Sequence, residues 1–183
     1  NGNTLIVGGS SDMVGAPMLA AEAAVHSGAG KITLGVPDII KHVVQGHIIP
    51  EVMVTSIDEN ESLYDGRQVV AIGPGLGRTT DIPDVVNQAI DSCEGALVID
   101  ADALYALGHV GSVDKDALRD GHIESVYKVQ KNLPYCVMTP HLGEFSRLID
   151  LPIKWIERHY ITLARALLQV LLAKVIPYKM VQF

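Results

Sequence analysis

Short apolar runs, bordered by glycine, proline or polar residues, recur along the first 150 residues of the chain. They lie within 4–7, 31–37, 68–72, 95–100 and 135–141 and are rich in Val, Ile and Leu. Apolar runs of this length are typical of strands that are buried on both faces of a sheet. The pattern therefore predicts a central sheet built from these segments.

Helices are expected between the predicted strands. The segment 17–27 consists almost entirely of small residues, begins with proline and is followed by Gly28. Proline suits the first turn of a helix and glycine suits its end. Further helices are expected at 82–92 and 142–149. The repeated order of strand, loop and helix predicts a mostly parallel sheet with helices on both faces.

Other parts of the chain fit this alternation less well. The segment 38–55 is compatible with a helix broken at Gly46 and a short strand after it. The stretch 108–132 is polar and charged, which indicates a surface excursion with one or two short helices. The tail, 153–183, begins as an amphipathic helix and ends in an apolar run that Pro177 interrupts.

Composition and charge limit the class of protein. A length of 183 residues suits one α/β domain. A net charge of −7 argues against nucleic-acid binding, which requires a basic face. Cys93 and Cys136 match no metal or redox spacing, so free thiols and a cytoplasmic location are expected. Since no apolar stretch reaches the roughly 18 to 20 residues that span a bilayer, no membrane insertion is expected.

Four loops after predicted strands carry residues that could bind a ligand or take part in catalysis. They are GGSSDMVGAP at 8–17, GPGLG at 73–77, DADAL at 100–104 and TPHLGE at 139–144. In open α/β sheets, ligands bind outside the carboxyl ends of the strands, where such loops converge. The first loop has neither the G-x-G-x-x-G spacing nor that of a P-loop, so a standard nucleotide-phosphate cradle is not expected there.

The GPGLG turn is a candidate anion site. Gly73, Gly75 and Gly77 surround Pro74 and make a fixed turn beside the start of a helix. Exposed backbone N–H groups at such a position suit an anion. An ordinary strand-to-helix turn explains the same residues equally well. Both interpretations stay open.

The charged candidates are two aspartates, a histidine and a glutamate. As alternate residues of an extended segment, Asp100 and Asp102 would point the same way. We expect Asp102 to cap the helix that begins near Ala103, and Asp100 to face the ligand. A lone histidine is more often structural, but the position of His141 after a strand favours ligand contact, whereas Glu144 favours the first turn of its helix. The histidines show no zinc spacing, so no metal site is predicted.

In this order, the motifs resemble the NAD(P)H-hydrate dehydratase family, the carbohydrate-kinase-like branch of the ribokinase superfamily. The resemblance covers residues 1 to about 150 and implies a ribokinase-like three-layer α/β/α fold with a mostly parallel sheet. It also implies a homo-oligomer, a tetramer in that family. The matching stretches are 8–10, 15–17, 27–30, 73–77, 100–104 and 139–145.

The resemblance further implies a repair enzyme of the lyase class. Such enzymes act on the S form of NADH or NADPH hydrate with ADP or ATP as co-substrate and Mg²⁺ as the accompanying ion. Phosphorylation of the added hydroxyl lets it leave as phosphate, and the nucleotide is left as AMP or ADP. By this resemblance Ala16, Gly73, Gly75 and His141 contact the hydrated dinucleotide, and Asp100 is expected to face the same site.

Part of the family pattern is absent from the sequence. The family continues to a GTGD turn whose glycines form an anion hole and whose aspartate is the general base, and this chain holds no such turn. Lys179 aligns with the family's nucleotide-binding lysine, but Pro177 and a missing glycine depart from the pattern. We expect one domain, 1–183, incomplete at both ends and lacking the C-terminal nucleotide-binding portion. Either segments are omitted or the protein is truncated, and the start at Asn1 without methionine favours omission.

Two other functions stay open at this stage. A small-molecule kinase of the same superfamily would phosphorylate a hydroxymethyl or sugar-like alcohol without the elimination step. An inactive dinucleotide-binding or assembly subunit would directly explain the missing turn.

Overall fold

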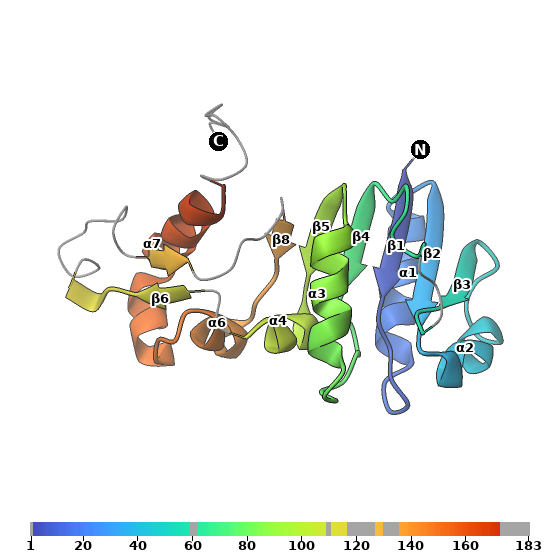
Figure 1. Cartoon of the computed structure of the whole chain (residues 1–183), viewed down its shortest axis with the longest axis horizontal. Helices are drawn as coiled ribbons and strands as arrows, with labels where there is room; N and C mark the ends of the chain where they lie inside the picture. Colours follow the sequence, from blue (N-terminus) through green and yellow to red (C-terminus); the bar gives the residue numbers. More distant parts are fainter. Residues whose placement is uncertain (1, 59–61, 109–110, 117–126, 130–135, 173–183) are drawn as a thin grey trace. The chain divides into compact units, whose positions relative to one another are not determined.

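The chain is seen here in a computed structural model that describes residues 2–58, 62–108, 111–116, 127–129 and 136–172. Its contacts define two compact units (Figure 1). The first unit is formed by 1–107 together with 136–139, and the second by 108–135 and 140–183. The expectation of a single domain over 1–183 stays a prediction.

A parallel sheet of six strands forms the centre of the first unit (Figure 1). The strand order is β3-β2-β1-β4-β5-β8, and all neighbouring strands pair in parallel. The apolar runs predicted as strands all belong to this sheet, which confirms the predicted α/β class. The strands are β1 (Asn3–Val7), β2 (Lys31–Val36), β3 (Val52–Ser56), β4 (Val69–Ile72), β5 (Ala96–Ile99) and β8 (Cys136–Met138).

The helices of the first unit follow its strands in alternation. They are α1 (Gly15–His26), α2 (Asp38–Gln45), α3 (Ile82–Ser92) and α4 (Ala101–Leu107). Helix α1 begins two residues before the predicted start, so Pro17 lies inside its first turn, where its missing N–H costs no helical hydrogen bond. The ambiguous segment 38–55 contains α2, which ends before Gly46, and then β3.

Apolar side chains bury both faces of the sheet. Ile6 and Leu34 face one layer, where they pack with Ala21 of α1 and Ile40 of α2. Leu5, which points to the other face, has no exposed surface. Crossovers between parallel strands are right-handed, so strands added on opposite sides of β1 send their helices to opposite faces. The expected three layers follow from this order.

The second unit contains a short hairpin and two helices. The strands β6 (Gly111–Val113) and β7 (Tyr127–Val129) pair antiparallel. The sequence pattern did not predict these strands in the polar stretch 108–132. Helix α6 (Leu142–Leu148) corresponds to the predicted helix at 142–149, and α7 (Ile153–Leu172) to the amphipathic start of the tail.

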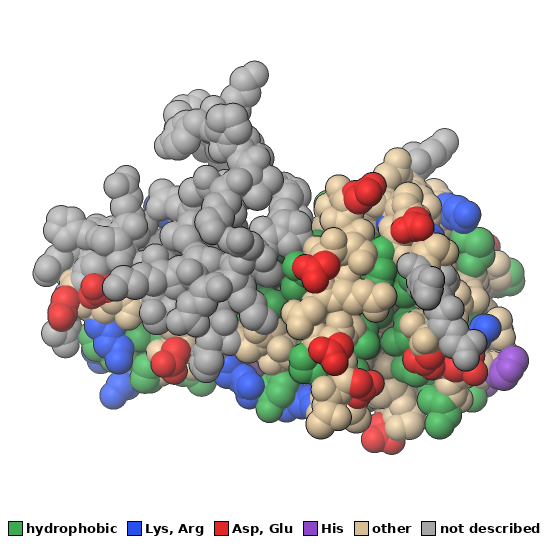
Figure 2. All heavy atoms as spheres, viewed as in Figure 1, with side chains coloured by type: hydrophobic (Ala, Val, Ile, Leu, Met, Phe, Trp, Pro, Cys, Tyr) green, Lys and Arg blue, Asp and Glu red, His purple; other side chains and the backbone are tan. Residues whose placement is uncertain are grey.

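Acidic side chains are scattered over the face of the first unit that Figure 2 shows. This distribution agrees with the net charge of −7. The two cysteines are free, with Cys93 buried at the end of α3 and Cys136 partly buried in β8. None of the helices in the described ranges combines the length and apolar character of a membrane span.

Candidate functional site

The direction in which the sheet grows reverses between two neighbouring strands, β1 and β4. From β1 the chain proceeds through β2 to β3, and from β4 it proceeds through β5 to β8 on the other side. In open α/β sheets, ligands bind outside the carboxyl ends of the strands at such a reversal. The loop that begins at Gly8 and the turn 73–77 follow these two strands directly. The fold therefore places the glycine-rich motifs where a ligand is expected.

The loop after β1 and the turn after β4 are joined by hydrogen bonds. The N–H of Gly9 donates to the carbonyl of Pro74 at 2.9 Å, and that of Gly73 donates to the carbonyl of Val7 at 3.0 Å. Gly8 lies so close to the carbonyl of Pro74 that a Cβ atom would collide with it. Glycine is needed here because two backbones meet without room for a side chain.

Ala16 and Gly75 lie next to each other at this edge. Gly75 has a φ of 69°, and a Cβ on it would lie 3.4 Å from the Cβ of Ala16 and 2.8 Å from the carbonyl oxygen of Met13. Ala16 is exposed in the first turn of α1. The structure thus brings these two predicted binding residues together, with Gly75 buried and Ala16 exposed.

The backbone of Asp100 packs against Gly73. Gly73 has a φ of 133°, and a Cβ there would collide with the carbonyl oxygen of Asp100. The N–H of Asp100 donates to the carbonyl of Ile72 at 3.0 Å. Asp100 is partly buried, so Gly73 and Asp100 join Ala16 and Gly75 at the same edge of the sheet.

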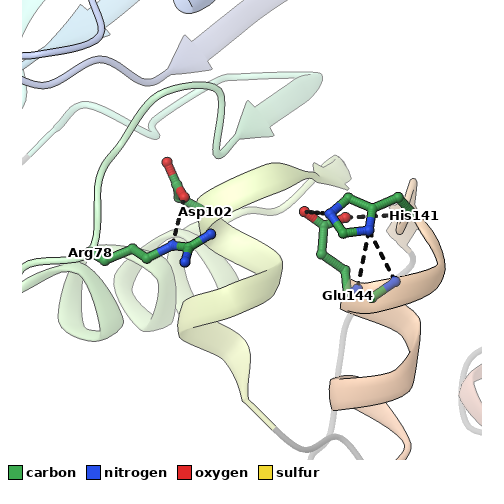
Figure 3. A network of polar contacts seen from close by, with 5 residues as sticks. Arg78, Asp102, His141 and Glu144 are labelled. Atoms are coloured by element: carbon green, nitrogen blue, oxygen red, sulfur yellow. Dashed lines mark hydrogen bonds and ion pairs between the residues drawn. The ribbon is translucent and has the colours of Figure 1, made fainter. Parts of the chain in front are cut away.

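Asp102 does not cap the helix, contrary to the sequence-based prediction. Helix α4 starts at Ala101, whose φ is 49°, so the chain turns there instead of staying extended. The two aspartates are therefore not alternate residues of a strand. The carboxylate of Asp102, which is 13% exposed, accepts a hydrogen bond from the N–H of Gly77 at 3.0 Å. It also accepts one from Nε of Arg78 at 3.3 Å (Figure 3).

Arg78 also stacks on an aromatic ring. Its guanidinium carbon lies 4.2 Å from the centroid of the Tyr105 ring, one turn along α4 from Asp102. No local sequence pattern indicates this contact, because Arg78 and Tyr105 are far apart in the chain. The one available signal was an arginine directly after the glycine turn.

The GPGLG turn offers fewer backbone donors than predicted. Gly73 donates to Val7, Leu76 to the carbonyl of Gly73 at 3.2 Å, and Gly77 to Asp102. Helix α3 begins only at Ile82, so the turn is not at a helix start. Among the described residues, Gly75 is the turn residue whose N–H has no protein acceptor. The expected set of exposed N–H groups is therefore too large.

Ser10 places an orphaned hydroxyl in the loop after β1. Its Oγ is buried and has no hydrogen-bond partner among the described residues. Ser10 lies against Gly77, since a Cβ on that glycine would be 3.6 Å from the hydroxyl oxygen. A buried hydroxyl without a partner is costly, and polar ligand atoms commonly satisfy such groups.

His141 belongs to the second unit, where it caps α6. Its Nδ1 accepts from the N–H groups of Gly143 at 3.0 Å and Glu144 at 3.4 Å, while Glu144 accepts from the N–H of His141 at 2.9 Å (Figure 3). This capping box confirms the helix-start role predicted for Glu144. Since Nδ1 accepts, the neutral ring carries its proton on Nε2, which lies 3.3 Å from Oε1 of Glu144. Ligand contact by the exposed ring of His141 stays a prediction.

The described residues include no cluster of side chains typical of a metal site. No group of three or more His, Cys, Asp or Glu within them could hold a metal ion. Lys179, the predicted nucleotide-binding residue, lies outside the described residues. No reaction step through ADP, ATP or Mg²⁺ can therefore be derived from these side chains.

The sheet order and the loops at its reversal define a ribokinase-like α/β protein. A solved ribokinase-like superfamily protein from Enterococcus faecalis matches with a TM-score of 0.69 and 23% identity, over 90% of this chain and 55% of that chain. The family model of NAD(P)H-hydrate dehydratases matches residues 4–180. The chain belongs to the NAD(P)H-hydrate dehydratase family.

Individual members of the family match this chain over most of its length, but the match covers only part of their own length. A bifunctional NAD(P)H-hydrate repair enzyme from Dictyoglomus turgidum is 32% identical over an alignment of 178 residues, which covers 90% of this chain and 31% of that protein. The ADP/ATP-dependent NAD(P)H-hydrate dehydratase from Bacillus subtilis, crystallised with ATP and Mg²⁺, matches with a TM-score of 0.68 and 25% identity, over 93% of this chain and 56% of that chain. The chain thus spans about a third of the curated relative and about half of the solved ones.

Proposed function

We propose that this chain carries the substrate-binding part of a nucleotide-dependent NAD(P)H-hydrate dehydratase. The reaction is the dehydration of the S form of NADH or NADPH hydrate, a carbon–oxygen lyase activity. ADP or ATP phosphorylates the hydroxyl of the hydrated ring, which then leaves as phosphate. Family membership supports this reaction, and the alternative of a sugar-like kinase lacks comparable support.

One observation carries the proposal most directly. The loop after β1 and the GPGLG turn meet where the strand order reverses, between β1 and β4. The hydrogen bond from the N–H of Gly9 to the carbonyl of Pro74 joins them there. The missing side chains of Gly73 and Gly75 let the two loops pack closely, and the small, exposed side chain of Ala16 leaves room beside them for a flat ring and its ribose. Asp100 at the same edge supplies a carboxylate that can accept a hydrogen bond from a substrate hydroxyl.

Ser10 adds a polar group to this binding surface. Its buried hydroxyl, which has no partner among the described residues, can donate to a carbonyl, phosphate or hydroxyl oxygen of the substrate. His141 is part of the same proposal as a substrate contact through its exposed ring, which is 73% accessible.

The nucleotide side of the reaction remains part of the proposal. ADP or ATP is the phosphate donor, Mg²⁺ neutralises its phosphates, and Lys179 contacts the nucleotide. The sequence holds no GTGD turn, so none of its residues is assigned as the general base. We further propose a cytoplasmic homo-oligomer, a tetramer as the family resemblance implies.

The deciding experiment measures turnover and binding separately. Freshly prepared NADH hydrate is mixed with the protein, Mg²⁺ and either ADP or ATP, and recovery of the absorbance of the reduced ring is followed. Binding of the hydrate without nucleotide is measured by calorimetry. Binding with recovery supports the dehydratase, binding without recovery supports the inactive dinucleotide-binding subunit, and absence of binding refutes the proposal.

A matched pair of glycine variants tests where the hydrate binds. Gly75→Ala introduces a methyl group beside Ala16 at a φ of 69°, whereas Gly66→Ala introduces one at a φ of 64° with nothing within 4 Å. Both variants strain the backbone, and in Gly75→Ala the methyl group also comes within 2.8 Å of the carbonyl oxygen of Met13, so the folded state of each variant is checked by chemical denaturation before binding is compared. Only Gly75→Ala is expected to weaken hydrate binding, and equal weakening by both would place the site elsewhere.

A further inference from the structure

The carboxylate of Asp102 holds one end of the GPGLG turn. One oxygen accepts from Nε of Arg78 at 3.3 Å (Figure 3). The other accepts from the N–H of Gly77 at 3.0 Å, so one side chain fixes two successive residues. The side chain is only 13% exposed. A carboxylate that is so little exposed to solvent must accept hydrogen bonds from the protein, and these bonds fix its position.

Helix α4 reaches the loop at a second point. Tyr105, three residues after Asp102, stacks under the guanidinium of Arg78 at 4.2 Å. Residues three apart lie on the same side of a helix. Arg78 thus forms an ion pair with Asp102 and a cation–π contact with Tyr105. Both partners lie on α4, which fixes their spacing.

The turn is held mainly by backbone hydrogen bonds and by the buried side chain of Leu76. Gly73, Gly75 and Gly77 all have a positive φ and carry no side chain to pack. Gly73 is placed by the backbone of Asp100. Gly77 is placed by Asp102 together with Ser10. Gly75, the predicted substrate contact, lies between these two fixed points.

From these contacts we propose that Asp102 is a positioning residue for substrate binding, acting through Gly77 on the conformation of Gly75. The inference rests on the proposed function, because it assumes that the turn contacts the hydrate. Asp102 itself does not touch the substrate. Its contribution is to keep the backbone around Gly75 in the conformation that the ligand requires, since a small misplacement of a binding group weakens its contact with the ligand.

Two substitutions at Asp102 separate positioning from general structural damage. In Asp102→Asn the amide oxygen can still accept from Gly77, and the exposed Arg78 can move away from the amide nitrogen. In Asp102→Ala the acceptor is lost. We expect the dissociation constant of NADH hydrate to rise about tenfold or more in Asp102→Ala and to stay within about threefold of wild type in Asp102→Asn.

Two further variants test the contribution of Arg78 and provide a control on a distant surface. Arg78→Gln removes only the exposed partner and is expected to change the dissociation constant by at most about fivefold. Asp91→Ala, on the exposed side of α3, is the matched control and is expected to leave binding unchanged. Where the protein turns over, the change should fall on KM, with kcat little affected.

Hydrogen exchange of the Gly77 amide tests the anchoring without any ligand. Exchange should be faster in Asp102→Ala and remain slow in Asp102→Asn. If wild type fails to bind the hydrate, the proposed function fails, whatever the exchange rates are. If wild type binds and Asp102→Ala binds equally well, or Asp102→Asn is as damaged as Asp102→Ala, the positioning role is overturned.

Discussion

The N–H of Gly9 lies 2.9 Å from the carbonyl oxygen of Pro74 and donates to it. This bond joins loops that follow β1 and β4, the two strands at which the sheet reverses its direction of growth. The loops therefore form one connected surface. A substitution that shifts one loop should therefore also alter the conformation of the other.

Substitution of Gly73 should destabilise the first unit. Gly73→Ala places a methyl group against the carbonyl of Asp100 at a φ of 133°, and we expect a loss of about 2 to 4 kcal/mol in the free energy of unfolding. Gly15→Ala is the comparison, since a methyl group there meets nothing within 4 Å in α1. It should raise the free energy of unfolding by about 0.5 to 1 kcal/mol. Chemical denaturation measures both, and equal behaviour of the two variants would contradict the close packing at Gly73.

Removal of the Ser10 hydroxyl should affect binding but not stability. Ser10→Ala deletes a buried oxygen that has no partner among the described residues, so the ligand-free protein should be unchanged or more stable by up to about 1 kcal/mol. Hydrate binding should weaken by about fivefold to tenfold if the hydroxyl meets the substrate. A clear loss of stability in the ligand-free protein would show that the hydroxyl is already satisfied within the chain.

Tyr64 should make the stability of the protein depend on alkaline pH. Burial, aided by the nearby Cys93, raises the pKa of Tyr64 from 10.0 to about 12. The unfolded chain thus releases this proton at lower pH than the folded protein does. The stabilising contribution is complete below pH 10.0 and is lost as the pH rises towards about 12.

The matching variant is Tyr64→Phe, which cannot ionise. Between about pH 9 and pH 12, wild type should lose about 2 to 3 kcal/mol more in the free energy of unfolding than this variant does. Urea denaturation at several pH values measures the difference. Parallel pH profiles for the two proteins would show that Tyr64 ionises as easily in the folded state as in the unfolded chain.

Variants of His141 can separate helix capping from substrate contact. His141→Ala removes the side-chain acceptor for Gly143 and Glu144 and should cost about 1 kcal/mol of unfolding free energy. His141→Asn keeps a good capping group, so stability should be preserved. If the ring contacts the hydrate, both variants bind it weakly. Normal binding by His141→Asn would leave His141 with a capping role alone.

The sequence was sufficient to predict the sheet. Segments such as 5–7 and 69–72 are apolar and are followed by glycine, and a strand buried on both faces has this apolar character. The segment 38–55 was ambiguous because a short helix and a short strand share one apolar stretch. The hairpin strands β6 and β7 were missed because each has only three residues in polar surroundings.

The site was predicted only in part, for a physical reason. Gly73 and Gly75 could be predicted from the local sequence, because the GPGLG motif is compatible with little other than a tight turn. The bond between Gly77 and Asp102 joins residues that are 25 positions apart, and no local pattern signals such a pairing. The left-handed conformation of Ala101 was equally hidden, because alanine shows no preference for it, and this one residue redirected the carboxylate of Asp102.

The row of positive φ angles at Gly73, Gly75 and Gly77 has a chemical consequence of its own. A surface made of peptide groups carries no ionisable proton, so its attraction for a ligand is the same in mildly acidic and mildly alkaline solution. Any pH dependence of hydrate binding should therefore originate in side chains around the turn or in the phosphate groups of the ligand itself. If the hydrate binds at this turn, as proposed, changes in cellular acidity should leave its contact with the peptide groups unaltered.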